Sequence, residues 1–355
     1  MKVLLLTDSN SIHTLRWANG LALNGVDIHL VSMHKPLDGY DDRVKHYTLP
    51  FKAPLGYFLN IFEFNSLLEK INPDVLNVHY ATGYGTLGAF HKRYPSLLSI
   101  WGSDVYKFPF KTIFHKYYLK FILSKYNALA STSECMATQI RKFNKNKQIF
   151  ITPFGIDTEA FREVRKNSCD EIIIGTVKTL SFNYGIDVLL HAFKSLLMEL
   201  PSNLKVKLEI VGGGVDECKL KDLASSLEIT DKVKFLGQVS HSQVPYYLNN
   251  FDIYVALSRF ESFGVAILEA SACSIPVVVS DADGPKEVTI DCVTGFVVPR
   301  NNPHEASLKL KNLVMDKSLR ERMGGEGREH VIRNYTWATS LKKMIEAYSY
   351  LSKGS

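Results

Sequence analysis

Short apolar runs alternate with amphipathic stretches along most of this 355-residue chain. In the first half, runs rich in β-branched residues predict strands, and the segments between them repeat apolar residues at helical spacing. Strands are expected at residues 3–7, 27–32, 74–79, 97–101, 128–132 and 149–153. Helices are expected near 13–24, 58–71, 84–93, 111–125 and 133–143. This alternation favours parallel strands joined by crossover helices, which predicts a doubly wound sheet.

A second series of strands follows a polar stretch at 157–171, which we interpret as a linker. Its strands are expected at 172–177, 205–211, 232–236, 253–257, 276–280 and 295–298. The chain after residue 303 reads as helical, and residues 336–351 are expected to pack back across the linker. The pattern therefore predicts an α/β protein of two Rossmann-like, doubly wound parallel-sheet domains that face each other across a ligand-binding cleft. The expected domains are 1–160 with 336–355, and 161–335.

Composition narrows the class of protein. The longest apolar runs have about five residues, whereas a membrane span needs roughly 20. The apolar stretch at residues 3–6 is also too short for a signal peptide, so a cytoplasmic protein is expected. No CxxC pair occurs, which disfavours a zinc site or disulfide framework and predicts buried or idle thiols in a reducing cytosol. The five cysteines are Cys135, Cys169, Cys218, Cys273 and Cys292.

Positive charge is concentrated in the first half. Residues 1–165 carry 20 Lys and Arg against 13 Asp and Glu, whereas residues 166–355 carry 22 against 23. Residues 105–133 contain five lysines and no carboxylate, with apolar residues at helical spacing between them. The segment 107–126 fits contact with an anionic membrane surface on the inner face of the cell membrane, and it equally fits an ordinary crossover helix. No nucleic-acid-binding motif accompanies this charge, so nucleic acid is not an expected partner.

The sequence ESFGVAILE at residues 261–269 is the most informative motif. It follows an expected strand and opens a helix, which we expect to begin near Phe263. Unpaired N–H groups and the positive end of the helix dipole make such a terminus suitable for a diphosphate, and Gly264 allows close approach. At helical rise, Glu261 and Glu269 would lie roughly 10–12 Å apart along the axis. Two carboxylates so placed can accept hydrogen bonds from hydroxyl groups on either side of a diphosphate.

Read through residue 278, this motif closely resembles the E-x7-E signature of retaining family-4 glycosyltransferases of GT-B fold. Further segments resemble the family in the same order along the chain. In the first half these are SIHTLRWA at 11–18, PDVLNVH at 73–79, WGSD at 101–104 and TPFGID at 152–157. In the second half they are IVGGG at 210–214, FLGQV at 235–239, GPKE at 284–287 and TGF at 294–296.

The resemblance implies that the second domain binds a nucleotide sugar and that the first binds the acceptor. Glu261 and Lys178 are the implied catalytic residues: Glu261 would hold the sugar hydroxyls, and Lys178 would stabilise the leaving diphosphate. Glu269 would hold the ribose. The implied donor-binding set is Ser11, Lys178, Tyr184, Gly212, Gln238, Val239, Ser262, Phe263, Gly264, Val265 and Glu269.

Three positions depart from the family pattern. Lys178 stands where the family has an arginine, and Tyr184 stands where it has a lysine. Lys178 can neutralise a phosphate but lacks the bidentate fork of arginine. Trp101 replaces the frequent histidine of the first domain. The implied acceptor-side residues are therefore His13, His79, Trp101 and Asp104.

The expected function is transfer of a hexose, with retention, from a UDP- or GDP-linked donor to a lipid-linked or polysaccharide acceptor in cell-surface glycan synthesis. We expect no cofactor and no metal, because Asp281 and Asp283 lie after a strand where a turn is expected. Two alternatives remain open. One is a nucleotide-sugar epimerase of the same fold, and the other is a non-catalytic nucleotide-sugar-binding protein.

Overall fold

The computed structural model describes residues 1–91, 94–164 and 171–354, which form two compact units. The N-terminal unit comprises Met1–Pro153 with Ala338–Ser355, and the second unit comprises Phe154–Trp337. Residues 165–170 of the expected linker, Cys169 among them, lie outside the described residues. The other four cysteines are free thiols: Cys273 is buried, Cys135 is half-buried, and Cys218 and Cys292 are exposed.

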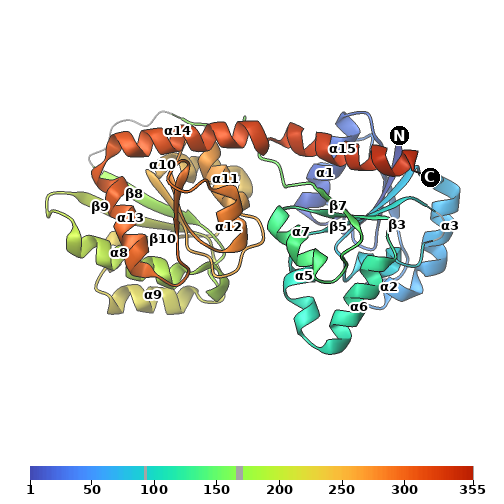
Figure 1. Cartoon of the computed structure of the whole chain (residues 1–355), viewed down its shortest axis with the longest axis horizontal. Coiled ribbons are helices and arrows are strands. Elements are labelled where there is room, and N and C mark those ends of the chain that lie inside the picture. The colour runs from blue at the N-terminus through green and yellow to red at the C-terminus, as the bar shows by residue number, and fades with distance from the viewer. Residues whose placement is uncertain (92–93, 165–170, 355) are drawn as a thin grey trace. The chain divides into compact units, whose positions relative to one another are not determined.

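The N-terminal unit contains a parallel sheet in the order β3-β2-β1-β4-β5-β6-β7 (Figure 1). Its strands are β1 Lys2–Leu6, β2 Asp27–Ser32, β3 Lys45–Thr48, β4 Val75–His79, β5 Ser96–Ile100, β6 Ala128–Ser131 and β7 Gln148–Ile151. Six of them match expected strands to within about two residues. The seventh, β3, was not predicted, because this edge strand reads KHYT and presents no buried residue to reveal it.

The helices of this unit flank the strands, and their bounds differ from the prediction in two places. They are α1 Ile12–Leu23, α2 Gly56–Leu59, α3 Ile61–Ile71, α4 Tyr84–Gly88, α5 Ser103–Tyr106, the 3-10 turn η1 Phe108–Phe110, α6 Ile113–Ser124, α7 Glu134–Arg141 and α15 Trp337–Lys353. The single helix expected at 58–71 is divided at Asn60. The side chain of this residue accepts from the Phe51 N–H at 3.1 Å and donates to the Phe51 carbonyl at 2.7 Å. The helix expected at 84–93 ends at Gly88.

The second unit contains a parallel sheet in the order β10-β9-β8-β11-β12-β13. Its strands are β8 Glu171–Val177, β9 Lys205–Val211, β10 Val233–Gly237, β11 Ile253–Ala256, β12 Val277–Ser280 and β13 Gly295–Val298. Its α-helices are α8 Ile186–Glu199, α9 Glu217–Ser226, α10 Val244–Asn250, α11 Val265–Ala272, α12 Asp283–Val288, α13 Pro303–Met315 and α14 Lys317–Asn334. The 3-10 turns η2 Phe182–Tyr184, η3 Thr230–Lys232 and η4 His241–Gln243 complete it.

Apolar residues on both faces of the second sheet account for its two helical layers. In β12, Val278 belongs to one hydrophobic cluster, while Val277 and Val279 belong to another. Residues of α8 and α13 fill the first cluster, and residues of α10, α11 and α14 fill the second. A strand buried on both sides reads as a continuous apolar run, as is typical of parallel sheets. The predicted fold class of two Rossmann-like parallel-sheet domains is confirmed.

The chain passes between the units at residues different from those expected. Ile156 donates its N–H to the Tyr335 carbonyl at 2.7 Å and accepts from the Trp337 N–H at 2.9 Å. These bonds attach residues 154–160 to the second unit, so the boundary falls at 153/154 rather than at 160/161. The return occurs at 337/338 rather than at 335/336.

The final helix α15 packs on the N-terminal unit, as the sequence predicted. Leu341, Met344 and Tyr348 are buried. The Tyr348 hydroxyl accepts from the Asn77 side chain of β4 at 2.7 Å. Among the described residues, no helix combines the length and apolar character needed to span a bilayer.

Candidate active site

Lys178 and Glu261 meet at the point where the strand order of the second sheet reverses. Lys178 follows β8 directly, and Glu261 lies in the loop after β11, which is the neighbour of β8 in the sheet. The loops after two such strands run to opposite sides of a doubly wound sheet and leave a crevice at its carboxyl edge. Residues 83 positions apart in sequence are thereby brought together.

These two side chains form a nearly buried ion pair. The Lys178 Nζ atom lies 2.5 Å from Glu261 Oε1, and the exposed fractions of the side chains are 6% and 12%. The Ser258 hydroxyl donates to the other carboxylate oxygen at 2.7 Å. Burial disfavours the ammonium ion, but the Glu261 carboxylate outweighs burial and raises the pKa of Lys178. The site therefore holds a permanent cation with its counter-ion already in place.

Tyr184 contacts this pair, although it replaces the family's lysine. The Lys178 Nζ atom lies 5.3 Å from the centre of the Tyr184 ring, within range of a cation–π contact. Tyr184 ends the turn η2, and Gly185 follows it with a φ of +64°. A Cβ atom at Gly185 would lie 2.0 Å from the Leu257 carbonyl oxygen. This close approach, which only glycine permits, brings the loops after β8 and β11 together.

Helix α11 begins two residues later than predicted. Its first residue is Val265, and Gly264 caps it with a φ of +119°. The side chain of Phe263 is buried, with its ring 6.4 Å from that of Phe154 and 6.0 Å from that of Tyr335. The first N–H groups of α11, including that of Val265, have no carbonyl partner within the helix, because the helix has no residue four positions before them. This terminus therefore suits an anion, as the sequence predicted. Glu261 precedes the helix, so helical rise alone does not set its separation from Glu269.

Glu269 is buried within α11 and is bound by a histidine that the sequence analysis did not identify. Its Oε1 atom lies 2.8 Å from Nε2 of His241, which opens the turn η4 after β10. Glu269 is 4% exposed, whereas the His241 side chain is about half exposed. Residue spacing could not have revealed this contact, because the two residues belong to different crossover units.

The loop after β9 lies beside Lys178 and against the loop after β10. Gly212 has a φ of +139°, and a Cβ atom there would lie 1.9 Å from the Lys178 carbonyl oxygen. Its N–H donates to the Gly237 carbonyl at 2.8 Å. A Cβ atom at Gly213 would lie 3.6 Å from Cβ of Gln238, so this residue of the predicted donor-binding set lies against the glycine loop. The Val239 side chain packs against the hydrophobic cluster that contains α11.

Arg259 is a second residue of the candidate site, after His241, that the sequence analysis did not identify. It makes a bidentate pair with Asp187 of α8, at 2.8 Å and 2.7 Å. Its guanidinium lies 4.1 Å from the Phe182 ring centre. Since Phe182 opens the turn that carries Tyr184, and Arg259 lies two residues before Glu261, this clamp fixes both loops of the site. A basic residue within two positions of Glu261 was the available signal.

Asp281 has a structural partner, and Asp283 opens a helix. Asp281 accepts from the Arg300 N–H at 2.9 Å and from Arg300 Nε at 3.0 Å, and Asp283 begins α12. Ser262, the remaining loop residue of the predicted donor set, lies between Glu261 and Phe263. Within the described ranges, no three His, Cys, Asp or Glu side chains gather in a way that could hold a metal ion.

The predicted acceptor-side residues of the N-terminal unit form an aromatic cluster. The Trp101 ring centre lies 5.8 Å from that of His13 and 5.0 Å from that of His79. Burial, with a smaller contribution from His13, lowers the pKa of His79 to about 3. His79 is therefore neutral at physiological pH. Its Nε2 atom lies 3.2 Å from the Asn77 amide nitrogen.

Asp104 holds backbone segments beside this cluster, whereas Ser11 makes a local backbone bond before α1. The Asp104 carboxylate is fully buried and accepts from the N–H groups of Ala81, Gly102 and Trp101 at 3.0, 2.8 and 3.4 Å. Burial raises the pKa of Asp104, and these bonds oppose that rise. Ser11 precedes α1 in extended backbone, and its N–H donates to the Asp8 carbonyl at 3.2 Å. Asp104 thus ties the loops after β4 and β5 together.

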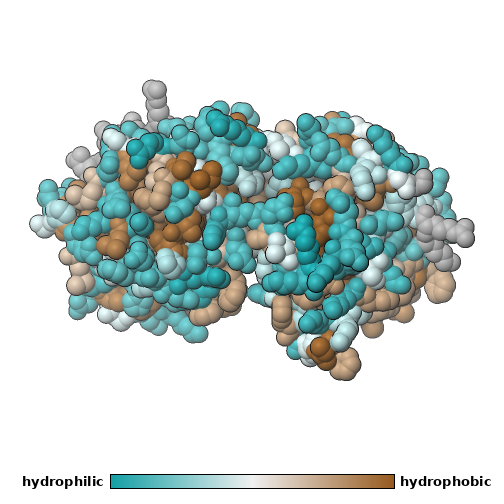
Figure 2. Space-filling view, viewed as in Figure 1, coloured by the Kyte–Doolittle hydropathy of each residue, from teal (hydrophilic) through white to brown (hydrophobic). Residues whose placement is uncertain are grey.

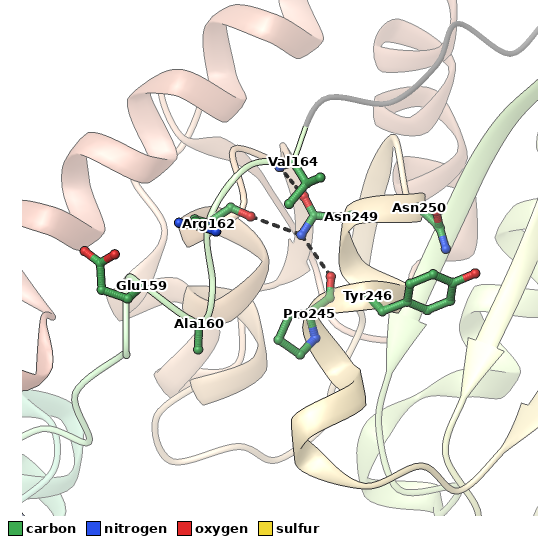
Figure 3. Close-up of a pocket in the computed structure, with 8 residues that line it drawn as sticks. All are labelled: Glu159, Ala160, Arg162, Val164, Pro245, Tyr246, Asn249 and Asn250. Atoms are coloured by element: carbon green, nitrogen blue, oxygen red, sulfur yellow. Dashed lines mark hydrogen bonds between the residues drawn. The ribbon is translucent and has the colours of Figure 1, made fainter.

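A separate pocket of about 410 Å³ lies beside α10 (Figure 3). It is lined by Glu159, Ala160, Arg162, Val164, Pro245, Tyr246, Asn249 and Asn250. The Asn249 side chain donates to the Arg162 and Pro245 carbonyls at 3.0 and 2.9 Å and accepts from the Val164 N–H at 2.8 Å. None of the predicted site residues lines this pocket. Its polar contacts fasten the segment after residue 157 to α10.

Known families match both units. Residues 157–330 match the family described as "Glycosyl transferases group 1", and residues 2–133 match the family described as "Glycosyl transferase 4-like". The capsular polysaccharide biosynthesis glycosyltransferase CapM of Staphylococcus aureus is 25% identical over 380 residues, which cover 99% of this chain and 97% of CapM.

Solved structures resemble the whole chain. Sucrose-phosphate synthase from Thermosynechococcus elongatus superposes with a TM-score of 0.86 at 20% identity and covers 100% of both chains. Anabaena HepE in complex with UDP-glucose superposes with a TM-score of 0.79 at 16% identity, covering 99% of this chain and 100% of HepE. These likenesses bear out the fold, and the family matches bear out the class of enzyme. The chain belongs to the family-4-type glycosyltransferases of GT-B fold.

Proposed function

We propose that this glycosyltransferase moves a hexose from a UDP- or GDP-linked donor to a hydroxyl group of a lipid-linked or polysaccharide intermediate in cell-surface glycan synthesis, with retention at the anomeric carbon. The observation that carries the proposal is the buried Lys178–Glu261 pair at the β8–β11 switch point, in the loop that leads into α11. Relatives support the substrate classes: CapM acts in capsular polysaccharide biosynthesis, and HepE binds UDP-glucose.

The donor diphosphate would bind where two sources of positive potential converge. Lys178 supplies a cation, and the first amides of α11 supply N–H donors. In the free protein, Glu261 already neutralises Lys178 at 2.5 Å. A bound diphosphate would share the ammonium group, and the Glu261 carboxylate could then accept hydrogen bonds from the hydroxyls of the donor sugar. Glu269, held by His241, would accept from the ribose hydroxyls.

The chemical step breaks the bond between the anomeric carbon and the diphosphate oxygen. The electron pair of that bond leaves with the nucleoside diphosphate, the acceptor oxygen forms the new bond on the same face, and the proton of the acceptor hydroxyl passes to the departing diphosphate oxygen. Negative charge grows on the leaving group, so a preorganised cation and amides lower the barrier. His79 is neutral and buried, which makes it a packing partner of Trp101 in this scheme rather than a titrating base.

The test combines site variants with a panel of UDP- and GDP-sugars. Lys178→Ala and Glu261→Ala should each lower the rate of transfer by about 10²–10³-fold, the usual effect of losing one transition-state donor. Where no acceptor is supplied, the rate of donor hydrolysis should fall by the same factor. Glu269→Ala should mainly weaken nucleotide binding, by about tenfold, as expected for a lost charge-assisted hydrogen bond. Lys219→Ala is the matched control, because that lysine is exposed on α9.

Each alternative has its own outcome. Equal rates for the parent and all three site variants would overturn the site assignment. Isomerisation of a donor without acceptor would identify an epimerase instead. Binding of a nucleotide sugar by the parent with neither transfer nor hydrolysis would identify a binding protein.

A further inference from the structure

Large apolar side chains are exposed on two neighbouring helical segments of the N-terminal unit. Phe62 of α3 is 89% exposed, and Phe114 of α6 is 80% exposed. Single exposed apolar residues are ordinary, but a gathered set indicates an interaction site. Figure 2 shows hydrophobic atoms at the lower end of this unit, where α6 lies in Figure 1. The apolar set comprises Leu55, Phe58, Leu59, Phe62, Phe110, Ile113, Phe114, Tyr117 and Phe121, all exposed.

Both segments rest on the short helix α4. The Tyr57 ring of α2 lies 5.7 Å from the Tyr84 ring of α4. The Thr86 hydroxyl of α4 lies 2.8 Å from the Tyr118 hydroxyl of α6. Both segments therefore contact the same short helix within a single unit.

The packing of α6 decides between the two interpretations of its apolar stripe. Leu119, Ile122 and Leu123 are buried in the core, as a crossover helix requires. Ile113, Phe114, Tyr117 and Phe121 remain exposed on the same helix. Packing on the sheet therefore explains only one face of α6, and the residues that the structure describes leave a second apolar face of this helix exposed.

The charges around this second face select its partner. Lys107, Lys111, Lys116 and Lys125 are exposed, and Lys120 is half-buried. Lys125 Nζ lies 4.7 Å from the Phe121 ring centre, and Lys120 Nζ lies 5.7 Å from that of Tyr117. This arrangement matches the interface of a bilayer. The aromatic rings and lysine stems would contact acyl chains, and the ammonium groups would contact the anionic headgroups above them. A second copy of the chain would present the same positive charge and would be repelled.

We propose that the N-terminal unit docks on anionic membranes through this apolar set and the lysines of residues 107–125. Lys107, the first lysine of this surface, lies three residues after Asp104 of the acceptor-side cluster, in the same unit. If the function proposed above holds, docking would present that cluster to an acceptor carried by a membrane lipid. The docking itself needs no donor or acceptor, so its test is independent of that function.

The experiment is flotation of the full chain with vesicles of phosphatidylcholine, with or without phosphatidylglycerol. The parent should float with anionic vesicles at low salt, and it should stay at the bottom of the gradient when the vesicles are neutral. The variant Lys111→Gln/Lys116→Gln/Lys120→Gln should bind anionic vesicles about 100-fold more weakly, since each basic residue near such a surface contributes about fivefold. Phe62→Ser/Phe114→Ser should also release the protein, because both rings would otherwise be buried in the interface.

The matched control is Lys219→Gln/Lys232→Gln/Lys317→Gln, which removes three exposed lysines of the second unit. It should float like the parent. A parent that does not float with anionic vesicles, or a control that loses as much binding as the α6 variant, would overturn the proposal. Concentration-dependent self-association that Phe62→Ser/Phe114→Ser abolishes would also overturn it, because a second copy would then cover the surface. Circular dichroism checks that each variant is folded.

Discussion

At the scale of single residues, the charge state of a buried group depends on what lies beside it. Lys178 and His79 are both almost fully buried at strand ends. Glu261 lies 2.5 Å from Lys178 and keeps it charged. His79 has an amide nitrogen and another imidazole nearby, and it stays neutral. The first group can therefore attract an anion, whereas the second can only pack and accept or donate a hydrogen bond.

The neutral His79 predicts a loss of stability in acid. Its pKa is lowered to about 3 in the folded unit, against 6.5 for an unperturbed histidine. Between these values the unfolded chain binds the proton and the folded chain does not, so stability falls as pH decreases, by up to about 1.4 kcal/mol per pH unit. Urea unfolding at pH 7.5 and pH 5 measures this. His79→Asn should show a smaller pH dependence than the parent, and an equal dependence would contradict the assignment.

At the scale of elements, the candidate site depends on the loops that follow strands. The loop after β8 carries Lys178 and Tyr184, and the loop after β11 carries Glu261. Arg259 joins the two loops, because its guanidinium donates two hydrogen bonds to the Asp187 carboxylate and also stacks on the Phe182 ring. A planar guanidinium can make both contacts at once, and a lysine ammonium cannot.

Arg259→Lys should therefore loosen the site without removing any group that we place on the donor. We expect transfer or donor hydrolysis to fall by about tenfold, as misplacement of positioned groups commonly lowers turnover. The Michaelis constant for the donor should change less than kcat. The control Arg300→Lys alters a half-exposed pair with Asp281 in the same unit and should leave both constants unchanged. Parent-like kinetics for Arg259→Lys would show that the clamp is dispensable.

At the scale of the whole molecule, the last two helices of the chain pack in the cores of different units. Helix α14 contributes Val331 to a core cluster of the second unit, whereas α15 buries Tyr348 in the first. The Tyr348 hydroxyl accepts from Asn77, which lies in the central strand β4. The C-terminal helix is thus part of the first unit's core.

Tyr348→Phe should weaken the N-terminal unit alone. The substitution keeps the ring but leaves the buried Asn77 amide with one acceptor fewer, at a cost of about 1–3 kcal/mol. Hydrogen exchange followed by mass spectrometry should show faster exchange in β4 and α15 and unchanged exchange in β8 and β11. Equal acceleration in both units would mean that they open together, and no acceleration would mean that the hydrogen bond contributes little.

The amino-acid sequence by itself predicted two doubly wound sheets and the positions of most strands along the chain, and its resemblance to a known family pointed to Lys178 and Glu261. Apolar periodicity and glycine-rich loops act over a few residues, so a linear reading captures them. It missed β3, whose edge position leaves no buried residues, and the break at Asn60, which depends on contact with Phe51. Only the tertiary structure decided the contacts of Glu269 with His241 and of Arg259 with Asp187, and which apolar residues of α6 stay exposed. Each of these depends on which elements become neighbours, and that is a property of the folded chain rather than of any local stretch.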